Sequence, residues 1–457
     1  MTRWSTPTSL LVVAVACLLA GCSITSSSGA GSDSAPSPTI AELPDDENVT
    51  IVFESYNYGS AGAWADTFTA LIADFEAQHP NIDVVAQKPQ GSSPNPASDT
   101  ISSIQTQITA GSPPDVAQLG FSDLDFTING LGAANLDELI GKDKVDALFD
   151  EGDYPFYQPV RDLGTWEGAT YGVPFVLSTP VLYYNATLFE QAGLDPTDPP
   201  ATWDEVSQAA QQITGTTGKG GIYVDCLTKS AKDWCFQSLV RSNGGTVISS
   251  DRTTLTYDDP AVAEVTDVMA QMVTDGSFPA LAQMQAVEAF AAGELGMILE
   301  SSAIQGTFAA GAKSGWKLQA ASLPSFGDKP AVPTNSGAAL YLFADDPLKQ
   351  AAGWELINYL TSPEAYVTIA NGIGYLPLRE GMTEGSGQLK EWYDQNPLVA
   401  PNLKQLAAIE PWVSMPGDSY LQIRDGMMDA VESIVFSGAE PQTTLQQAAE
   451  AGAELMP

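Results

Sequence analysis

Histidine is nearly absent from this chain of 457 residues, because His79 is the only one. A catalytic triad, a histidine general base or a metal site with several imidazoles is therefore not expected. His79 follows an apolar-periodic stretch in the run Gln78-His79-Pro80. We expect it to be a polar residue at the C-terminus of a helix.

Basic residues are also scarce, since 18 Lys and Arg face 56 Asp and Glu, giving a formal net charge of -38. Such a surface repels nucleic acid, whose binding depends on clustered cations, and repels anionic lipid headgroups. It suits a neutral or cationic ligand, whereas an anionic ligand would need a local cationic pocket. We therefore expect no nucleic-acid partner.

The chain has no apolar run long enough to span a bilayer. Its longest candidate, Leu10 to Ala20, follows Arg3 and ends in Leu19-Ala20-Gly21-Cys22. That ending resembles the bacterial lipobox, which predicts a signal peptide over 1–21 and a lipid on Cys22. A plain secretory signal with an incidental cysteine is the alternative. The first interpretation places the protein on the extracytoplasmic face of the cell membrane, held there by its lipid anchor only.

Residues 22–47 form an expected tether, because Ser23 to Asp46 is rich in Ser, Gly, Ala and Pro. Of the four cysteines, Cys17 would leave with the signal and Cys22 would be acylated. The remaining pair, Cys226 and Cys235, is expected to form a disulfide in an exported protein. No metal site and no cofactor are expected.

The body from residue 48 alternates short β-type runs with helical periodicity. Strands are expected at 50–54, 82–86, 115–119, 180–185 and 296–299. Helices are expected at 64–78, 101–110, 262–275, 284–292, 350–361 and after 420, and one begins at a capping box formed by Thr202 and Glu205. This alternation predicts an α/β fold with parallel sheets covered on both faces.

Ligands of such folds bind at the carboxyl ends of the strands. The loops that follow Phe53 and Leu119 combine aromatic and short polar side chains, a mixture that suits a sugar-like ligand. They supply these candidate ligand-binding residues: Tyr56, Asn57, Tyr58, Phe121 and Asp123.

Four motifs occur in a characteristic order. They are Val173-Pro174-Phe175 followed by Ser178-Thr179-Pro180-Val181-Leu182-Tyr183-Tyr184-Asn185, Pro200-Ala201-Thr202-Trp203-Asp204, Phe290-Ala291-Ala292-Gly293-Glu294-Leu295-Gly296-Met297, and Gly374-Tyr375-Leu376-Pro377-Leu378-Arg379. The ordered set covers nearly the whole mature chain and resembles the solute-binding proteins of ABC importers, extracellular family 1. Within that family it is most similar to the glycerol-3-phosphate and glycerophosphodiester binders.

The resemblance implies a two-lobe, periplasmic-binding-protein-like α/β fold of type II, with a hinge between the lobes and a ligand cleft. Hinge closure would enclose a small molecule and present the protein to the transmembrane subunits of an ABC permease. We expect one lobe to contain 48–177 and 302–345, and the other 178–301 and 346–457. A binding protein of this kind is a monomer and not an enzyme.

The resemblance also implies ligand contacts from residues that match the family's site. These are Ser178 at the chain crossing, Trp234 as a stacking residue, Ser301 and Ser302 after the crossing strand, Asn335, Ser336 and Gly337 in a glycine-rich loop, and Tyr375.

Two departures from the subgroup affect the expected ligand. The phosphate binders carry an Arg shortly before the Met-Pro of the last segment, but Pro411-Trp412-Val413-Ser414 stands there in this chain. Their acidic residue after the third strand is displaced to Asp123 or Asp125. Because a phosphate dianion favours bidentate guanidinium contacts, we expect a neutral sugar or polyol, with Trp412 as a stacking surface.

Other functions remain open at this point. Glycerol-3-phosphate or a phosphodiester such as glycerophosphocholine is the alternative ligand for the same transporter type, since aromatic and acidic groups can surround a quaternary ammonium. An exported glycan hydrolase with two carboxylates and a surface adhesin or sensor without a permease are further alternatives.

Overall fold

The computed structural model describes residues 40–59, 62–92 and 96–457. The expected signal peptide, Cys22 and most of the expected tether lie outside the described residues. The described chain forms two hydrophobic cores, each built on its own sheet, which we call the first and the second lobe. No helix in this part of the chain is long and apolar enough to cross a membrane.

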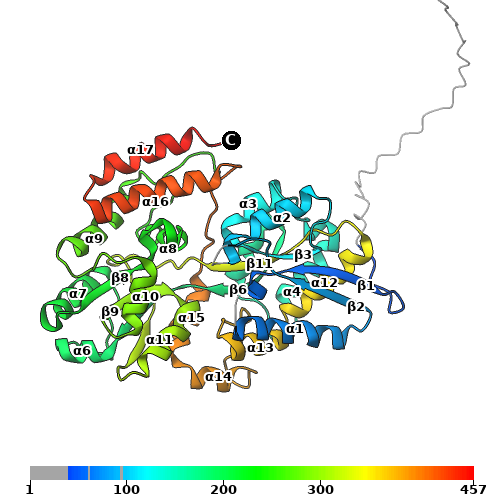
Figure 1. The fold of residues 1–457 in the computed structure, drawn as a ribbon, viewed down its shortest axis with the longest axis horizontal. Coiled ribbons are helices and arrows are strands. Elements are labelled where there is room, and N and C mark those ends of the chain that lie inside the picture. Colours follow the sequence, from blue (N-terminus) through cyan, green and yellow to red (C-terminus); the bar gives the residue numbers. More distant parts are fainter. Residues whose placement is uncertain (1–39, 60–61, 93–95) are drawn as a thin grey trace, which may run out of the picture. The chain divides into compact units, whose positions relative to one another are not determined.

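The first lobe is built on a five-stranded sheet (Figure 1). In sheet order its strands are β2 (Ile82–Gln87), β1 (Val49–Glu54), β3 (Val116–Gly120), β11 (Ser336–Leu342) and β6 (Gly172–Ser178). β1 pairs in parallel with β2 and β3, as expected, but β11 runs antiparallel to both β3 and β6. The sheet is therefore mixed, because β11 enters it from the second lobe and runs in the opposite direction.

Helices cover this sheet because each presents an apolar stripe to it. In α1 (Ala63–Gln78), Phe68, Leu71 and Phe75 follow helical spacing and are fully buried. The other helices whose buried residues belong to this core are α2 (Thr100–Thr109), α4 (Lys142–Asp150), α5 (Gln158–Arg161), α12 (Pro347–Leu360), α13 (Pro363–Ile373) and α15 (Ala400–Gln405). The first lobe also contains two short helices, α3 (Leu124–Asn129) and α14 (Lys390–Gln395). It contains in addition a small hairpin formed by β4 (Thr165–Trp166) and β5 (Ala169–Thr170).

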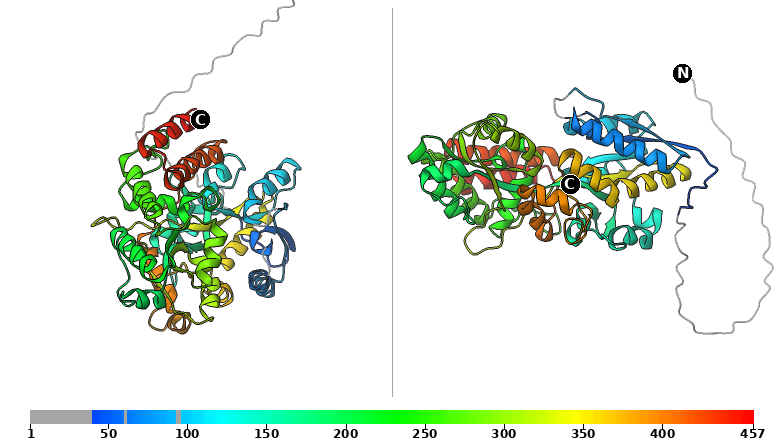
Figure 2. Two further views of the ribbon diagram at one scale, coloured as in Figure 1. Left: turned by 60° about the vertical axis from the view of Figure 1, so that its left-hand side comes forward. Right: turned by 90° about the horizontal axis from the view of Figure 1, so that it is seen from below.

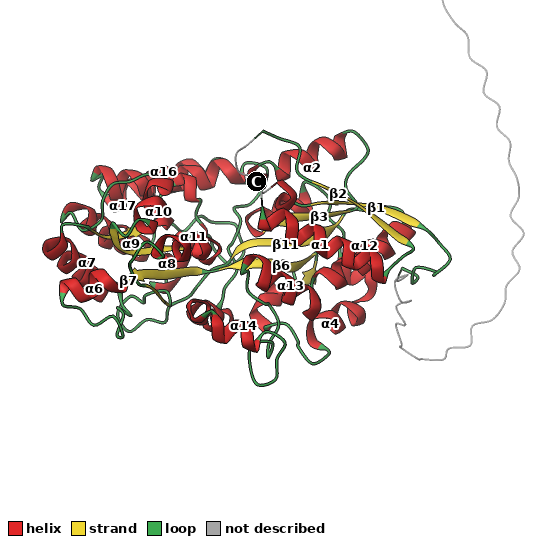
Figure 3. Ribbon diagram, turned by 60° about the horizontal axis from the view of Figure 1, so that its bottom comes forward, coloured by secondary structure: helices red, strands yellow, loops and turns green. Residues whose placement is uncertain are grey.

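The second lobe is built on a four-stranded sheet. In sheet order its strands are β10 (Leu318–Ala321), β7 (Pro180–Asn185), β9 (Leu295–Ser301) and β8 (Gly220–Val224). β8 and β9 are parallel, whereas β7 is antiparallel to β9 and to β10. Figure 3 shows the strands of both sheets flanked by helices.

In the part of the chain that the structure describes, eight helices contribute buried residues to the second core. They are α6 (Ala186–Ala192), α7 (Trp203–Thr217), α8 (Trp234–Ser242), α9 (Pro260–Thr274), α10 (Gln283–Ala291), α11 (Gln305–Ala312), α16 (Tyr420–Ser437) and α17 (Pro441–Ala453). α9, α16 and α17 pack on one another, as Figures 1 and 2 show. α7 begins at the expected capping box, in which Thr202 accepts from the backbone of Glu205 and the Glu205 carboxylate accepts from that of Thr202.

Within the described residues, the chain crosses between the cores at three places. Ser178 ends β6 in the first sheet and Pro180 begins β7 in the second. The second crossing precedes β11 and contains Thr334, and the third contains Glu410. These two crossings run side by side, because Thr334 and Glu410 form a parallel bridge. Gln405 stabilises the first crossing, because its amide donates to the Thr179 hydroxyl at 2.6 Å and to the Pro180 carbonyl at 3.0 Å.

These crossings divide the chain differently from the expected boundaries at 301/302 and 345/346. Phe308, Ala321 and Leu323 belong to the second core, whereas the run from Ala352 to Ile409 packs in the first. The expected division placed a boundary directly after β11. The chain instead stays in the first lobe for α12 and α13, because their apolar faces pack against β1, β11 and α1.

The other expected elements are confirmed to within a few residues, and His79 is the C-terminal cap of α1, stacked on Phe75 at 4.5 Å.

Candidate functional site

A cavity of about 380 Å³ lies between residues of the two lobes. The first lobe supplies its lining from the carboxyl ends of β1, β3 and β6 and from the start of β11. The second lobe supplies the carboxyl ends of β8 and β9, the start of α8 and residues near the third crossing. Those residues are Tyr56, Ala97, Gly120, Ser122, Asp123, Ser178, Ser336, Gly337 and Tyr375 on one side, and Asp225, Ser230, Ala231, Lys232, Trp234, Gln283, Glu300, Ser301, Ala303, Ile304 and Trp412 on the other.

Four aromatic rings line this cavity, two from each lobe. Tyr375 is 8% exposed and meets Trp64 edge-on at 5.0 Å. Burial raises the pKa of both Tyr56 and Tyr375, so both hydroxyls stay neutral hydrogen-bonding groups. Trp234 and Trp412 are also almost entirely buried. Flat apolar surfaces with neutral polar edges suit the C–H faces and hydroxyls of a sugar.

Two serines link the strand ends where the lobes meet. The Ser301 hydroxyl at the end of β9 donates to the Ser178 hydroxyl at the end of β6, at 2.9 Å. Beside them, Gly337 has φ of +118°, and a Cβ there would lie 2.1 Å from the Val176 carbonyl oxygen. Only glycine fits this close approach of β11 to β6.

The second-lobe side of the cavity is acidic. Asp225 follows β8 and Glu300 lies near the end of β9, and each side chain is about 1% exposed. Burial raises the pKa of both carboxyls, and the two are in hydrogen-bond contact with each other. Burial and the repulsion between two adjacent carboxylates both favour protonation of the pair.

Trp412 is held by a buried polar network. Its indole nitrogen donates to Asp233 Oδ1 at 3.0 Å, and its backbone nitrogen donates to Asn335 Oδ1 at 2.7 Å. Gln237 donates to Asp233 Oδ2 at 2.7 Å and accepts from Val413 N at 3.0 Å. This network fixes the orientation of an aromatic wall of the cavity.

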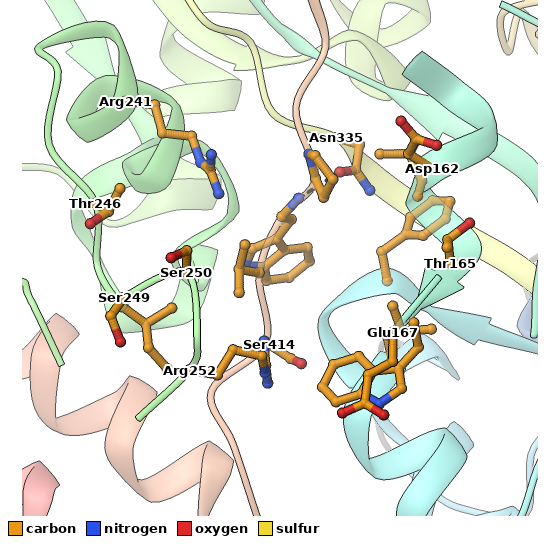
Figure 4. A pocket seen from close by; sticks show the side chains of 18 residues that line it. Asp162, Thr165, Glu167, Arg241, Thr246, Ser249, Ser250, Arg252, Asn335 and Ser414 are labelled. Carbon is orange, nitrogen blue, oxygen red and sulfur yellow. Dashed lines mark hydrogen bonds between the residues drawn. The ribbon is translucent and has the colours of Figure 1, made fainter. Parts of the chain in front are cut away.

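Trp412 also lines a second cavity of about 370 Å³, shown in Figure 4. The hairpin residues Trp166 and Glu167 line it from the first lobe, and Arg241 and Arg252 from the second. Arg252 forms a 2.8 Å ion pair with Asp125 and lies 4.5 Å over the Trp166 ring. The lobes are therefore in direct contact at this second cavity.

Nine of the residues expected at the ligand site line the first cavity. They are Tyr56, Asp123, Ser178, Trp234, Ser301, Ser336, Gly337, Tyr375 and Trp412. The disulfide between Cys226 and Cys235 closes the segment that carries Ser230, Lys232 and Trp234.

Five expected residues lie elsewhere. Phe121 and Asn335 line the second cavity, because the residues next to them in sequence face the first. Asn57 is fully buried, where its amide donates to Gln118 at 2.9 Å. Tyr58 packs edge-on against Phe53 and Phe68, and the Ser302 hydroxyl accepts from Thr179 N at 3.4 Å.

Sequence reasoning missed the acidic side of the site. Asp225 follows directly after the strand β8, so the carboxyl-end rule could have identified it had that strand been assigned. Glu300 is one of 56 Asp and Glu residues, and no neighbouring motif distinguishes it from the others. Gln283 and Lys232 carry no local signal, because a helix start and a loop bring them to the cavity.

Comparison with known proteins gives concordant results. A family model described as bacterial extracellular solute-binding protein matches residues 70–401. The sn-glycerol-3-phosphate-binding periplasmic protein UgpB of Brucella abortus is 27% identical over 299 residues, which cover 63% of this chain and 67% of that protein. The UgpB of Rhizobium meliloti is 27% identical over 297 residues, covering 63% and 68%.

Two solved structures share the fold. The cyclic alpha-maltosyl-1,6-maltose binding protein from Arthrobacter globiformis has a TM-score of 0.76 at 23% identity, covering 89% of this chain and 100% of that one. UgpB from Mycobacterium tuberculosis in complex with glycerophosphocholine has a TM-score of 0.74 at 21% identity, covering 89% and 98%. The fold is therefore the two-lobe type II fold of periplasmic binding proteins.

Proposed function

Because the chain belongs to the family of bacterial extracellular solute-binding proteins, we propose that it is the lipid-anchored binding component of an ABC-type importer and captures a neutral carbohydrate or polyol. The ligand would bind in the first cavity, between the lobes, and be delivered unchanged to the membrane permease. Cys22 would carry the lipid that anchors the protein at the extracytoplasmic face, with the following residues as its tether.

The charge of the cavity lining carries this proposal. Among the described residues that line it, Lys232 is the single cation, whereas Asp123, Asp225 and Glu300 are acidic. A phosphate dianion would bind beside three carboxyl groups with one ammonium group and no guanidinium. Four aromatic rings and several hydroxyl groups favour a sugar instead.

A glycerophosphodiester is the second candidate. It is supported by the names of the UgpB relatives and by the related structure that holds glycerophosphocholine. In that case Lys232 would face the phosphate, and the acidic and aromatic groups would surround the quaternary ammonium.

A thermal-shift panel tests both candidates, because a ligand that binds only the folded protein raises its Tm. The panel sets neutral mono- and disaccharides against glycerol-3-phosphate and glycerophosphocholine. We expect a shift with a neutral sugar, which chromatography should then recover unhydrolysed. A shift with the phosphate compounds alone would contradict the carbohydrate proposal, and hydrolysis of the sugar would contradict a transport role.

A further inference from the structure

The paired carboxyl groups of the first cavity are not explained by a neutral ligand. Val224 of β8 pairs with Leu299 of β9, so Asp225 and Glu300 follow at the next position of two parallel neighbouring strands. Both line the cavity and both side chains are about 99% buried. The ends of these two strands hold the two carboxyl groups together in the lining of the cavity.

Few protein donors satisfy these groups. Asp225 Oδ2 accepts from the Gln283 amide at 3.1 Å, and Glu300 Oε1 accepts from the Ser301 backbone nitrogen at 2.7 Å. Asp225 Oδ1 and Glu300 Oε2 have no donor among the described residues. Each carboxyl group therefore keeps one buried oxygen for a hydrogen-bond donor of a ligand, since both residues line the cavity.

The surroundings do not supply a cation to the pair. Tyr183 of β7 and Tyr223 of β8 interact electrostatically with Glu300, and Tyr223 also with Asp225 and with Glu432 of α16. Gln283 of α10 is neutral. Lys232, on the cavity wall, forms no ion pair with any of the described residues. Among the described residues, no cation is therefore in contact with the pair.

We propose that the ligand carries a protonated amine, as in an amino sugar, and that its N–H groups replace the proton shared by Asp225 and Glu300. This rests on the proposed role as the carbohydrate-binding component of an importer, and it replaces the neutral sugar of that proposal with one that carries a positive charge. On binding, the carboxyl pair releases one proton to solvent and the ligand ammonium donates one N–H to each carboxylate, so charge and protons balance. The repulsion between the two carboxylates is thereby compensated.

The number of donors distinguishes this ligand from the other candidates. A hydroxyl group donates one hydrogen bond and brings no charge, so the pair would keep its own proton. A quaternary ammonium brings charge but has no N–H, so both oxygens would remain unsatisfied. An amine with two or more N–H groups provides both the charge and the donors.

Isothermal titration calorimetry of the intact protein tests the proposal with matched probes. These are glucosamine against glucose and N-acetylglucosamine, chitobiose against cellobiose, and glycerophosphocholine. We expect the amines to bind at least about tenfold more tightly than their neutral counterparts, which corresponds to one pKa unit of differential interaction. We also expect binding of the amines to release protons, which titrations in buffers of different ionisation enthalpy measure. The affinity for the amines should therefore rise by up to about tenfold from pH 6 to pH 7.

Glu300→Gln and Asp225→Asn are the test variants, and Glu288→Gln, an exposed carboxylate on α10, is the matched control. In each test variant we expect the preference for the amine over its neutral counterpart and the proton release to disappear. In Glu288→Gln both should persist. If a variant fails to fold, the probe ratio and proton release of the unaltered protein still decide the question.

Equal or tighter binding of the neutral sugars would overturn this inference and leave the proposed function intact. Binding of glycerophosphocholine alone, or of none of the probes, would overturn both.

Discussion

The Tyr420 hydroxyl donates a hydrogen bond of 2.9 Å to Asp123 Oδ1, although the two residues lie 297 positions apart. Asp123 follows β3 in the first lobe and lines the ligand cavity, and Tyr420 begins α16 in the second. The Tyr420 ring also stacks on Phe126 at 5.7 Å. One side chain thus joins the two lobes and orients an acidic group of the site.

Tyr420→Phe should keep the ring stack and lose the hydrogen bond. We expect the free energy of unfolding to fall by about 1 kcal/mol, and ligand affinity to fall by roughly fivefold because Asp123 loses its fixed orientation. Urea unfolding and calorimetry measure the two effects. Tyr393→Phe in α14 is the control, and equal behaviour of the two variants would refute a role for this bond.

Arg252 and Asp125 should be energetically coupled across the lobes. Their side chains are 22% and 11% exposed, so solvent screens this ion pair less than a surface pair. A double-mutant cycle with Arg252→Ala and Asp125→Ala should give a coupling of about 1–3 kcal/mol in unfolding experiments. The exposed pair of Lys317 and Glu190 should give less than about 1 kcal/mol. Similar couplings for both pairs would mean that the lobe contact adds no stability.

Trp412 has a structural role as well as its expected ligand contact. Trp412→Ala and Trp234→Ala should both weaken ligand binding, but both rings belong to the second core, so alanine should also destabilise the fold by about 3–5 kcal/mol. Trp412→Phe separates the roles, because it keeps a ring and removes the donor to Asp233. We expect it to lose about 1–3 kcal/mol of stability, since Asp233 is buried.

Adding Asp233→Asn to Trp412→Phe should recover part of that loss, because a neutral amide is less costly to bury than a carboxylate. Thermal unfolding of the single and double variants measures the recovery. A double variant less stable than Trp412→Phe would contradict the proposed role of Asp233.

Stability should decrease as pH rises from about 4 to about 7. Burial raises the pKa of Asp225 to about 7 and raises that of Glu300 and Asp233. Between the unfolded and folded pKa values these carboxyls bind more protons in the folded chain, so raising the pH favours unfolding, by about 1.4 kcal/mol per pH unit for one proton.

Denaturant unfolding at pH 5, 6 and 7 measures this slope. Asp225→Asn should flatten it and Glu288→Gln should leave it unchanged. A slope of the same size in Asp225→Asn would assign the effect to other groups.

Local sequence signals predicted most helices and strands. The apolar spacing of Phe68, Leu71 and Phe75 indicated α1, and the Thr202 and Glu205 pair indicated the start of α7, because both patterns act within a few residues. Nine of the fourteen expected ligand residues reached the first cavity, since strand ends and motif positions are local features.

The sequence by itself thus determined the α/β class, the family resemblance and a ligand site poor in cations. Tertiary structure alone decided the mixed sheets, the return of α12 and α13 to the first lobe and which loop residues face the cavity. It also decided the pairing of Asp225 with Glu300, which lie 75 positions apart, the first directly after β8 and the second in the neighbouring parallel strand β9. Strand order and register depend on packing between distant segments, which neither periodicity nor composition encodes.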